Sequence, residues 1–169
     1  MSENYAMTNA TPAPADNLIG RLRQSLEALP SSSRLSRIDT EAIYAMAYNQ
    51  VMQGQIELAN GYLSLLTLYA PTTTKYLCGL GLTYKLLKAY DEALSVYTFA
   101  AALEPHQPQI TLSIAEVQML QGDFEGSRES LTLVVNYCAN HQEAAGIGKR
   151  AQTMLDLIGS AHRQGDASD

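Results

Sequence analysis

The sequence predicts an all-α protein built from stacked helical hairpins, and three observations carry that prediction. Apolar residues recur at spacings of three and four, as on one face of a helix, through most of the 169-residue chain. No stretch alternates apolar and polar residues between turn signals, as a half-buried strand would. The pattern of large and small residues also returns every 34 residues, and periods of roughly 20 to 50 residues are typical of helical solenoids.

Small residues mark where the helices of each hairpin cross. Two series recur at the 34-residue step, one of Ala47, Gly81 and Ala115 and the other of Ala59, Ala93 and Ser127. Small side chains at a crossing let two helix backbones approach to roughly 8–10 Å. Bulky residues recur between them, at Ile56, Tyr90 and Phe124 and at Leu63, Tyr97 and Leu131. Each repeat is therefore expected to be two helices packed across small residues.

Turn residues divide the repeats. Gly54 and Gly122 follow the first helix of their repeats, with Lys88 at the same place in the middle one, and Pro71 and Pro105 close two units. Glycine accepts a positive φ at no steric cost, and proline stops a helix. The middle unit, KYLCGLGLTYKLLKAYDEALSVYTFAAALEP, resembles the tetratricopeptide repeat. The resemblance implies a superhelix of three hairpins, with repeats at about 40–73, 74–107 and 108–141.

The flanks of the repeats have patterns of their own. Residues 1–15 are small, polar and proline-containing, and we expect a disordered arm. Residues 16–30 predict a helix opened by Asp16-Asn17 and closed by Pro30, and Ser31 to Arg34 read as a linker. The tetratricopeptide domain is placed at 39–162, including a capping helix at 142–162, and residues 163–169 form a tail.

Composition narrows the possible partners and the compartment. The net charge of −6 disfavours nucleic acid, which needs a basic surface. No apolar run reaches the roughly 20 residues that span a bilayer, so no membrane insertion is expected. The first residues lack both the basic start and the apolar core of a signal peptide. Two cysteines provide no disulfide framework, and together these features indicate a cytoplasmic protein.

The sequence shows no sign of catalysis. Cys78 and Cys138 do not form a CxxC motif, and the three histidines are scattered. The glycine pair Gly79 and Gly81 lies inside a repeat helix, where close packing explains it better than a phosphate loop. We therefore expect no enzyme, no catalytic residue, no metal and no cofactor.

The inner face of the superhelix is the expected binding site. In stacked hairpins the first helix of each repeat lines the concave surface, and such surfaces bind extended or helical peptides. Exposed apolar area of this kind usually marks a binding site. The peptide-binding groove is expected to consist of Tyr44, Tyr48, Val51 and Met52 from the first repeat, Lys75, Cys78, Leu82, Lys85 and Leu86 from the second, and Gln109, Leu112, Glu116, Met119 and Leu120 from the third.

A second resemblance narrows the function. The segments Ile43–Gln50 before Gly54, Cys78–Gly81 before Tyr90-Asp91, and Ile114–Glu116 resemble the class II chaperones of bacterial type III secretion, the SycD, LcrH and IpgC group. The likeness covers about residues 17–158. It implies a cytoplasmic chaperone that binds secreted, hydrophobic translocator proteins through an extended, proline-containing segment. It also implies a homodimer made through the N-terminal helix.

Alternatives remain at this point. The apolar groove and the layout of the chain favour the chaperone, and the alternative is a tetratricopeptide adaptor or scaffold of a secretion or pilus assembly. The leucine stripe of the N-terminal helix, Leu18, Leu22, Leu26 and Leu29, serves either as a dimerisation surface or as a cap on the first repeat of its own chain. Some tetratricopeptide proteins clamp acidic peptide tails with cationic groove residues. The matching positions here cannot neutralise carboxylates, because they are Tyr44, Tyr48, Gly79, Gln109 and Ser113.

Overall fold

The computed structural model describes residues 14–165, and every regular element in that range is a helix. The α-helices are α1 (Pro14–Glu27), α2 (Arg37–Met52), α3 (Ile56–Tyr69), α4 (Thr74–Leu86), α5 (Tyr90–Leu103), α6 (Pro108–Gln121), α7 (Phe124–Ala139) and α8 (Ala145–Gly165), with short 3-10 helices η1 (Pro30–Ser33) and η2 (Gln142–Ala144). The prediction of an all-α fold is confirmed.

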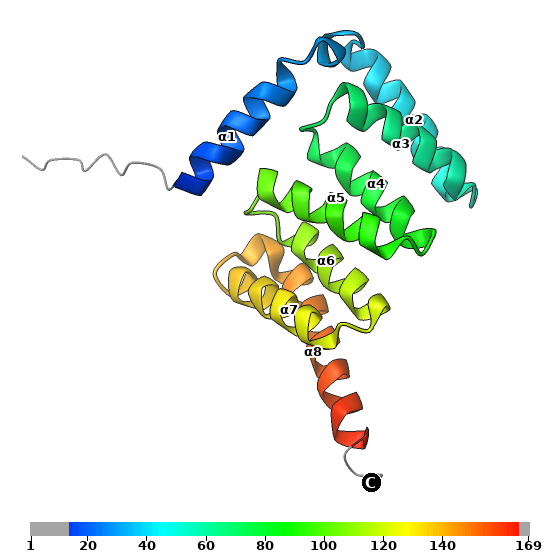
Figure 1. Cartoon of the computed structure of the whole chain (residues 1–169). Helices are drawn as coiled ribbons and strands as arrows, with labels where there is room; N and C mark the ends of the chain where they lie inside the picture. The colour runs from blue at the N-terminus through cyan, green and yellow to red at the C-terminus, as the bar shows by residue number, and fades with distance from the viewer. Residues whose placement is uncertain (1–13, 166–169) are drawn as a thin grey trace, which may run out of the picture.

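The helices form three hairpins stacked in chain order, α2 with α3, α4 with α5 and α6 with α7 (Figure 1). The second helices begin at Ile56, Tyr90 and Phe124, which are 34 residues apart, as the sequence repeat predicts. Helix α8 packs on α7 and follows the last hairpin. The three-hairpin superhelix with a helix at each end is confirmed. None of the helices within residues 14–165 is both long enough and apolar enough to cross a membrane.

The first hairpin begins earlier than the expected start near Asp39. The backbone N–H of Asp39 donates to the Ser36 hydroxyl at 3.2 Å, and Asp39 accepts from the N–H of Ser36 at 3.0 Å. This capping box makes Ser36 the residue before the helix and Asp39 its third residue. Hydrogen bonds from Ser36 hold the pKa of Asp39 below its usual value. The expected linker from Ser31 to Arg34 is also corrected, because Pro30–Ser33 is the 3-10 helix η1.

The two ends of the chain differ from expectation at their boundaries. Helix α1 begins at Pro14 rather than after a cap at Asp16-Asn17, consistent with the preference for proline in a first helical turn. It ends at Glu27, so Pro30 starts η1 instead of closing α1. Residues 14 and 15, expected in the arm, are therefore helical, and residues 1–13 lie outside the described range. Helix α8 continues to Gly165, past the expected end at 162.

Helix α1 lies against its own chain through a few contacts. Ile19 packs against the core cluster of the middle hairpin. The guanidinium of Arg23 donates to the carbonyl of Leu103 at 2.8 Å, and the hydroxyl of Thr72 donates to Glu27 at 2.9 Å. These contacts place α1 beside the C-terminal end of α5 and, at Glu27, against the loop that follows α3.

Small residues at the helix crossings are completely buried. Ala47, Ala59, Ala93, Ala115 and Ser127 have no exposed surface. The Ser127 hydroxyl donates to the Ala115 carbonyl at 2.9 Å, so a polar side chain at the crossing of α6 and α7 is satisfied. Larger apolar residues surround these positions in three core clusters. The crossings are thus where the two helices of each hairpin come closest.

Gly81 is a tight helix crossing that carries a glycine. A Cβ atom at Gly81 would lie 2.8 Å from Cζ of Tyr97 and 2.9 Å from two further atoms of the same ring. Tyr97 comes from α5, and Gly81 from α4 of the same hairpin. The aromatic ring therefore occupies the space that any side chain at this position would need.

We expect Gly81→Ala to lower the free energy of unfolding by roughly 1–3 kcal/mol, because the added methyl group overpacks the hairpin against Tyr97. Gly61→Ala in α3 is the matched control. A Cβ there meets nothing within 4 Å, so this variant should gain about 0.5–1 kcal/mol from better helix propensity. Urea unfolding followed by circular dichroism measures both. Equal effects in the two variants would contradict the proposed role of Gly81.

The turns between paired helices all pass through the left-handed region. Gly54 has φ 76° and Gly122 has φ 83°, whereas the equivalent residue of the middle hairpin, Lys88, has φ 61°. A side chain in this conformation brings its Cβ close to the following carbonyl oxygen, which costs energy that glycine avoids. The middle hairpin thus retains local strain that the other two do not have.

Lys88→Gly is therefore expected to stabilise the fold by up to about 1 kcal/mol, because relief of the left-handed conformation exceeds the added entropy of the unfolded chain. Thermal unfolding should show a higher melting temperature. Gly122→Ala introduces the reverse change and should lower it. A lower melting temperature for Lys88→Gly would show that the lysine side chain stabilises the fold by more than its left-handed backbone conformation destabilises it.

Candidate functional site

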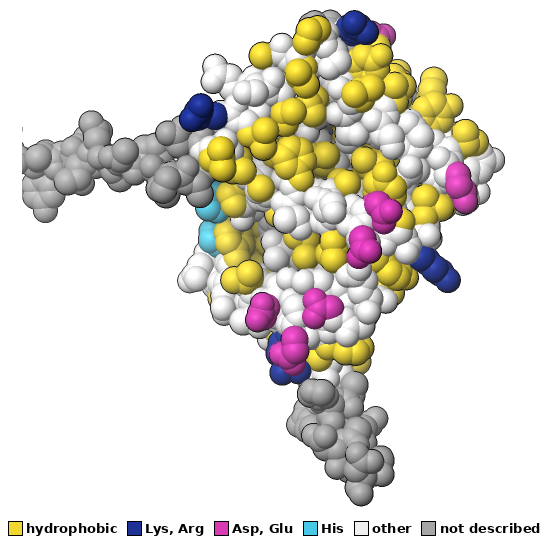
Figure 2. Space-filling view, in the orientation of Figure 1, with side chains coloured by type: hydrophobic (Ala, Val, Ile, Leu, Met, Phe, Trp, Pro, Cys, Tyr) yellow, Lys and Arg dark blue, Asp and Glu magenta, His cyan; other side chains and the backbone are white. Residues whose placement is uncertain are grey.

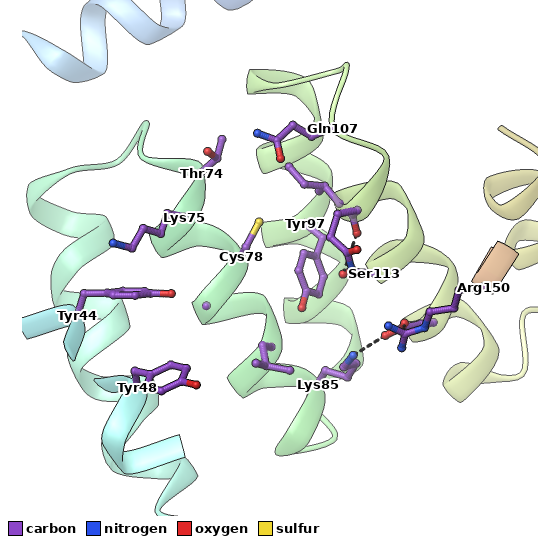
Figure 3. A pocket seen from close by; sticks show the side chains of 15 residues that line it. Tyr44, Tyr48, Thr74, Lys75, Cys78, Lys85, Tyr97, Gln107, Ser113 and Arg150 are labelled. Atoms are coloured by element: carbon purple, nitrogen blue, oxygen red, sulfur yellow. Dashed lines mark hydrogen bonds and ion pairs between the residues drawn. The ribbon is translucent and has the colours of Figure 1, made fainter. Parts of the chain in front are cut away.

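A cavity of about 650 Å³, hereafter the groove, opens between the first helices of the three hairpins. In Figure 3, Tyr44 and Tyr48 of α2 stand on one side and Arg150 of α8 on the other, with Cys78 and Tyr97 between them. The lining residues are Tyr44, Tyr48, Thr74, Lys75, Cys78, Gly79, Leu82, Lys85, Tyr97, Gln107, Gln109, Ile110, Ser113, Glu116 and Arg150.

The regular spacing of the lining residues follows from helix geometry. Residues three, four and seven apart share one face of an α-helix. On α6 this face holds Gln109, Ser113 and Glu116, and on α2 it holds Tyr44 and Tyr48. Because the second helices pack behind the first ones, the exposed face of each first helix turns toward the groove.

Most of the groove residues expected from the sequence line this cavity. They are Tyr44, Tyr48, Lys75, Cys78, Leu82, Lys85, Gln109 and Glu116. The repeat alone was sufficient to place them, because each lies on a first helix at the helical spacing.

The remaining expected groove residues do not line the cavity. Leu112 is corrected to the core, because it is fully buried in the cluster that α6 forms with α7 and α8, and Met119 packs against the same cluster. Met52 and Leu86 are exposed near the ends of their helices, outside the cavity, as is Leu120. Val51, the last of this set, is half-buried and also outside the lining.

The error at Leu112 has a simple cause. Leu112 precedes Ser113, and the two side chains point in directions about one quarter of a turn apart. The polar residue of the pair faces the groove and the apolar residue faces α7. The expectation that groove residues are apolar therefore pointed to the core face of α6 and not to its groove face.

Several lining residues were absent from the expected groove set. Gly79 and Ser113, compared above with a carboxylate clamp, both line the groove, as do Thr74, Gln107 and Ile110. Gly79 lies four residues after Lys75, and Ser113 lies four residues after Gln109, so helical spacing alone could have identified both. Two further residues come from helices other than the first of a repeat, Tyr97 from α5 and Arg150 from α8, and no repeat pattern identifies them.

Tyr97 reaches the groove from the second helix because Gly81 has no side chain to block its ring. Burial raises the pKa of the Tyr97 phenol, with a smaller opposing effect from a hydrogen bond with Ser113. Burial likewise raises the pKa of the Cys78 thiol. Both groups are therefore neutral at physiological pH, and this middle part of the groove is uncharged.

Charges at the α2 side of the groove are paired. The ammonium group of Lys75 lies 2.7 Å from a Glu41 oxygen and 4.1 Å from the centre of the Tyr44 ring. Tyr76 donates to the other Glu41 oxygen at 3.1 Å. The hydrogen bond with Glu41 raises the pKa of Lys75, and it holds the pKa of Glu41 below its usual value. Lys75 thus lies over the Tyr44 ring as one half of an ion pair.

Charges at the α8 side form a cluster of three. Glu116 of α6 receives Lys85 of α4 at 2.7 Å on one oxygen and Arg150 of α8 at 2.6 Å on the other. The cluster links two hairpins to the C-terminal helix. Lys85 and Glu116 are largely buried, whereas Arg150 is mostly exposed.

The described residues 14–165 hold no group of three or more His, Cys, Asp or Glu side chains arranged to bind a metal ion. What the groove offers is shape, apolar surface and hydrogen-bonding groups. Tyr44, Tyr48 and Leu82 supply apolar area, and the tyrosines are suited to interfaces because each combines a large ring with a hydroxyl. Such a surface can bind a ligand through apolar contacts and hydrogen bonds.

Comparisons with known proteins agree with this description. No family model matches the chain. The chain is 24% identical over 126 residues to the low calcium response locus protein H of Yersinia pestis, and the alignment covers 75% of each protein. The structure is similar to that of SycD, a type III secretion chaperone of Yersinia enterocolitica solved in complex with a peptide of the translocator YopD. That match has a TM-score of 0.70 at 24% identity and covers 77% of this chain and 99% of SycD.

A similar match is found with PcrH from Pseudomonas aeruginosa, at a TM-score of 0.70 and 25% identity over 77% of this chain and 98% of PcrH. Both matches extend over nearly the whole of the solved chain, so they concern the complete repeat stack. The chain is therefore a homologue of low calcium response locus protein H and has the fold of the translocator chaperone SycD and of PcrH.

Proposed function

We propose that this protein is a chaperone of type III secretion, which binds a hydrophobic translocator protein in the groove and keeps it soluble and ready for export. It acts in the bacterial cytoplasm by binding and catalyses no reaction. The observation that carries the proposal is a groove with Tyr44, Tyr48 and Leu82 in its lining, in a chain that is homologous over 126 residues to low calcium response locus protein H.

The solved relatives support the choice of ligand. SycD was solved with a peptide of the translocator YopD, and PcrH with the chaperone binding regions of PopB and of PopD. We infer that the corresponding ligand here is an extended, proline-containing segment of a translocator. An extended segment exposes its own backbone N–H and C=O groups. The side-chain amide of Gln109 lies in the groove to pair with them.

Most of the binding energy is assigned to apolar contact. Burying a large apolar side chain contributes roughly 1.5–3 kcal/mol, whereas a surface ion pair contributes at most about 1 kcal/mol. The middle of the groove is neutral, and Lys75 is already paired with Glu41. Binding of an uncharged apolar segment should therefore depend little on salt.

Tyr48→Ala and Leu82→Ala are each expected to weaken binding of a translocator segment at least about tenfold, because each removes apolar area from the groove. Isothermal calorimetry measures the effect. Met52→Ala is the matched control, since Met52 lies one turn beyond Tyr48 on α2 and outside the groove, and it should bind as the parent does. A loss of affinity as large in Met52→Ala, or a steep fall with added salt for an uncharged segment, would contradict apolar recognition in the groove.

An adaptor or scaffold role in a secretion or pilus assembly is the second candidate, and co-expression separates the two. A chaperone keeps an otherwise insoluble partner in solution, whereas an adaptor binds partners that are stable without it. Secreted proteins with long apolar segments, encoded beside this chain in its own genome, are the partners to express. If such a protein stays equally soluble with and without this chain, the adaptor reading is favoured.

Helix α1 and the residues just after its end at Glu27 carry an apolar stripe that its own chain leaves largely uncovered. Leu18, Leu22 and Leu29 are 65%, 40% and 44% exposed, and Leu26 is half-buried. On the face seen in Figure 2, hydrophobic side chains also gather over the upper part of the molecule, and acidic ones lie mainly in its middle and lower part. We propose that the leucine stripe pairs with a second copy of the chain to form a homodimer.

Removal of α1 tests this assembly. We expect the intact protein to form a dimer that dissociates on dilution, because one short helix buries little area. A chain that begins at Ser33 should be monomeric and still folded. Light scattering over a range of concentrations, with circular dichroism as a control for folding, measures both properties. An intact chain that stays monomeric, together with a truncated chain that unfolds, would show that α1 serves its own subunit alone.

A further inference from the structure

The α8 side of the groove carries one uncompensated positive charge. The two cations Lys85 and Arg150 share the single carboxylate of Glu116, at 2.7 Å and 2.6 Å. Each oxygen of that carboxylate lies within 2.7 Å of one of the two cations. The side chain of Glu116 is only 15% exposed, so solvent screens the cluster less than it would screen a surface pair. The chain as a whole is acidic, with a net charge of −6, so the positive charge is a local exception.

The two cations differ in what they can still bind. Lys85 is 17% exposed and its ammonium group faces Glu116, so it is largely committed to that contact. Arg150 is 60% exposed and gives only its Nη2 group to Glu116. A guanidinium has five N–H donors in a planar fork, which leaves Arg150 donors to form a second, charge-assisted pair with a carboxylate.

The opposite side of the groove has no such excess. Lys75 and Glu41 form a one-to-one pair, and the Tyr44 ring lies 4.1 Å from the ammonium group. In Figure 3, Lys75 and Arg150 lie on opposite sides of the groove. A ligand lying between α2 and α8 therefore meets a balanced pair at one side and an available cation at the other.

We propose that the segment bound in the groove carries an aspartate or glutamate that pairs with Arg150, so that α8 selects the ligand and sets its direction. This inference rests on the proposed function and adds a charged specificity element to the apolar groove. It also revises the comparison with carboxylate clamps, because the cation comes from α8 and not from the clamp positions on the first helices. The contact with the Glu116 carboxylate places one end of the Arg150 guanidinium at the groove.

The test uses short host peptides of alanine, leucine and proline, blocked at both ends so that no terminal charge contributes. Each peptide carries either aspartate or asparagine at one position, and the position is moved along the peptide. Fluorescence anisotropy with the full chain measures the affinities. At one position near one end, aspartate should bind about 2- to 5-fold more tightly than asparagine, and added salt should remove the difference.

Variants of α8 identify the cation responsible. Arg150→Gln should abolish the preference for aspartate, measured as the ratio of the affinities for the aspartate and asparagine peptides. Arg150→Lys should keep part of it, because the charge remains while the fork is lost. The matched control is Lys149→Gln, which removes the same charge from an exposed neighbour outside the groove and should keep the full preference. Thermal unfolding confirms that each variant is folded.

The outcomes separate this inference from the proposed function. If the asparagine peptides bind and aspartate gives no preference at any position, the inference is overturned and the apolar groove stands. The same holds if the preference survives in Arg150→Gln or disappears equally in Lys149→Gln. If no host peptide binds at all, the proposed function fails and the inference fails with it.

Discussion

Close contact between the two helices of each hairpin is the constraint on which the rest of this structure depends. Five small residues at the crossings, among them Ala47, Ala93 and Ser127, have no exposed surface, so the helix backbones meet there almost directly. A close crossing buries the inner row of each helix and leaves little room for larger side chains. Each hairpin then packs on the next one in the chain, α3 against α4 and α5 against α6. The shape of the whole stack therefore depends on small side chains at a few crossing positions.

The groove is a consequence of the same packing. Since α3, α5 and α7 cover one side of α2, α4 and α6, the free faces of the first helices turn toward a shared cavity. Gly81 adds something that packing alone does not require, because its missing side chain lets the ring of Tyr97 pass between the helices to the groove. A residue of the second helix thereby becomes part of the binding surface. Stability and binding are coupled at this position, and a substitution there affects both.

Apolar and charged parts of the groove have separate roles. The tyrosine and leucine surface provides affinity that depends on area, because removing apolar groups from water is favourable whatever the exact sequence of the ligand. Such affinity discriminates poorly between hydrophobic partners. The cluster of Lys85, Glu116 and Arg150 lies where three helices meet, and a fixed charge in a partly buried place favours one orientation of a ligand over the reverse. Under the proposed function, the apolar part holds the segment and the charged part sets its direction.

The sequence by itself determined the helical class, the three hairpins and their 34-residue step, because small, bulky and turn residues recur within short distances along the chain. It also identified the groove residues that follow from helical spacing, such as Tyr44, Tyr48 and Leu82. It failed at Leu112, where hydrophobicity does not distinguish a side chain that faces a ligand from one that faces α7. Only the tertiary structure decided that Tyr97 and Arg150 belong to the groove, because they come from α5 and α8 and reach it through packing between helices far apart in sequence. Local patterns record the periodicity of single helices, whereas contacts across the stack depend on how those helices are placed in space.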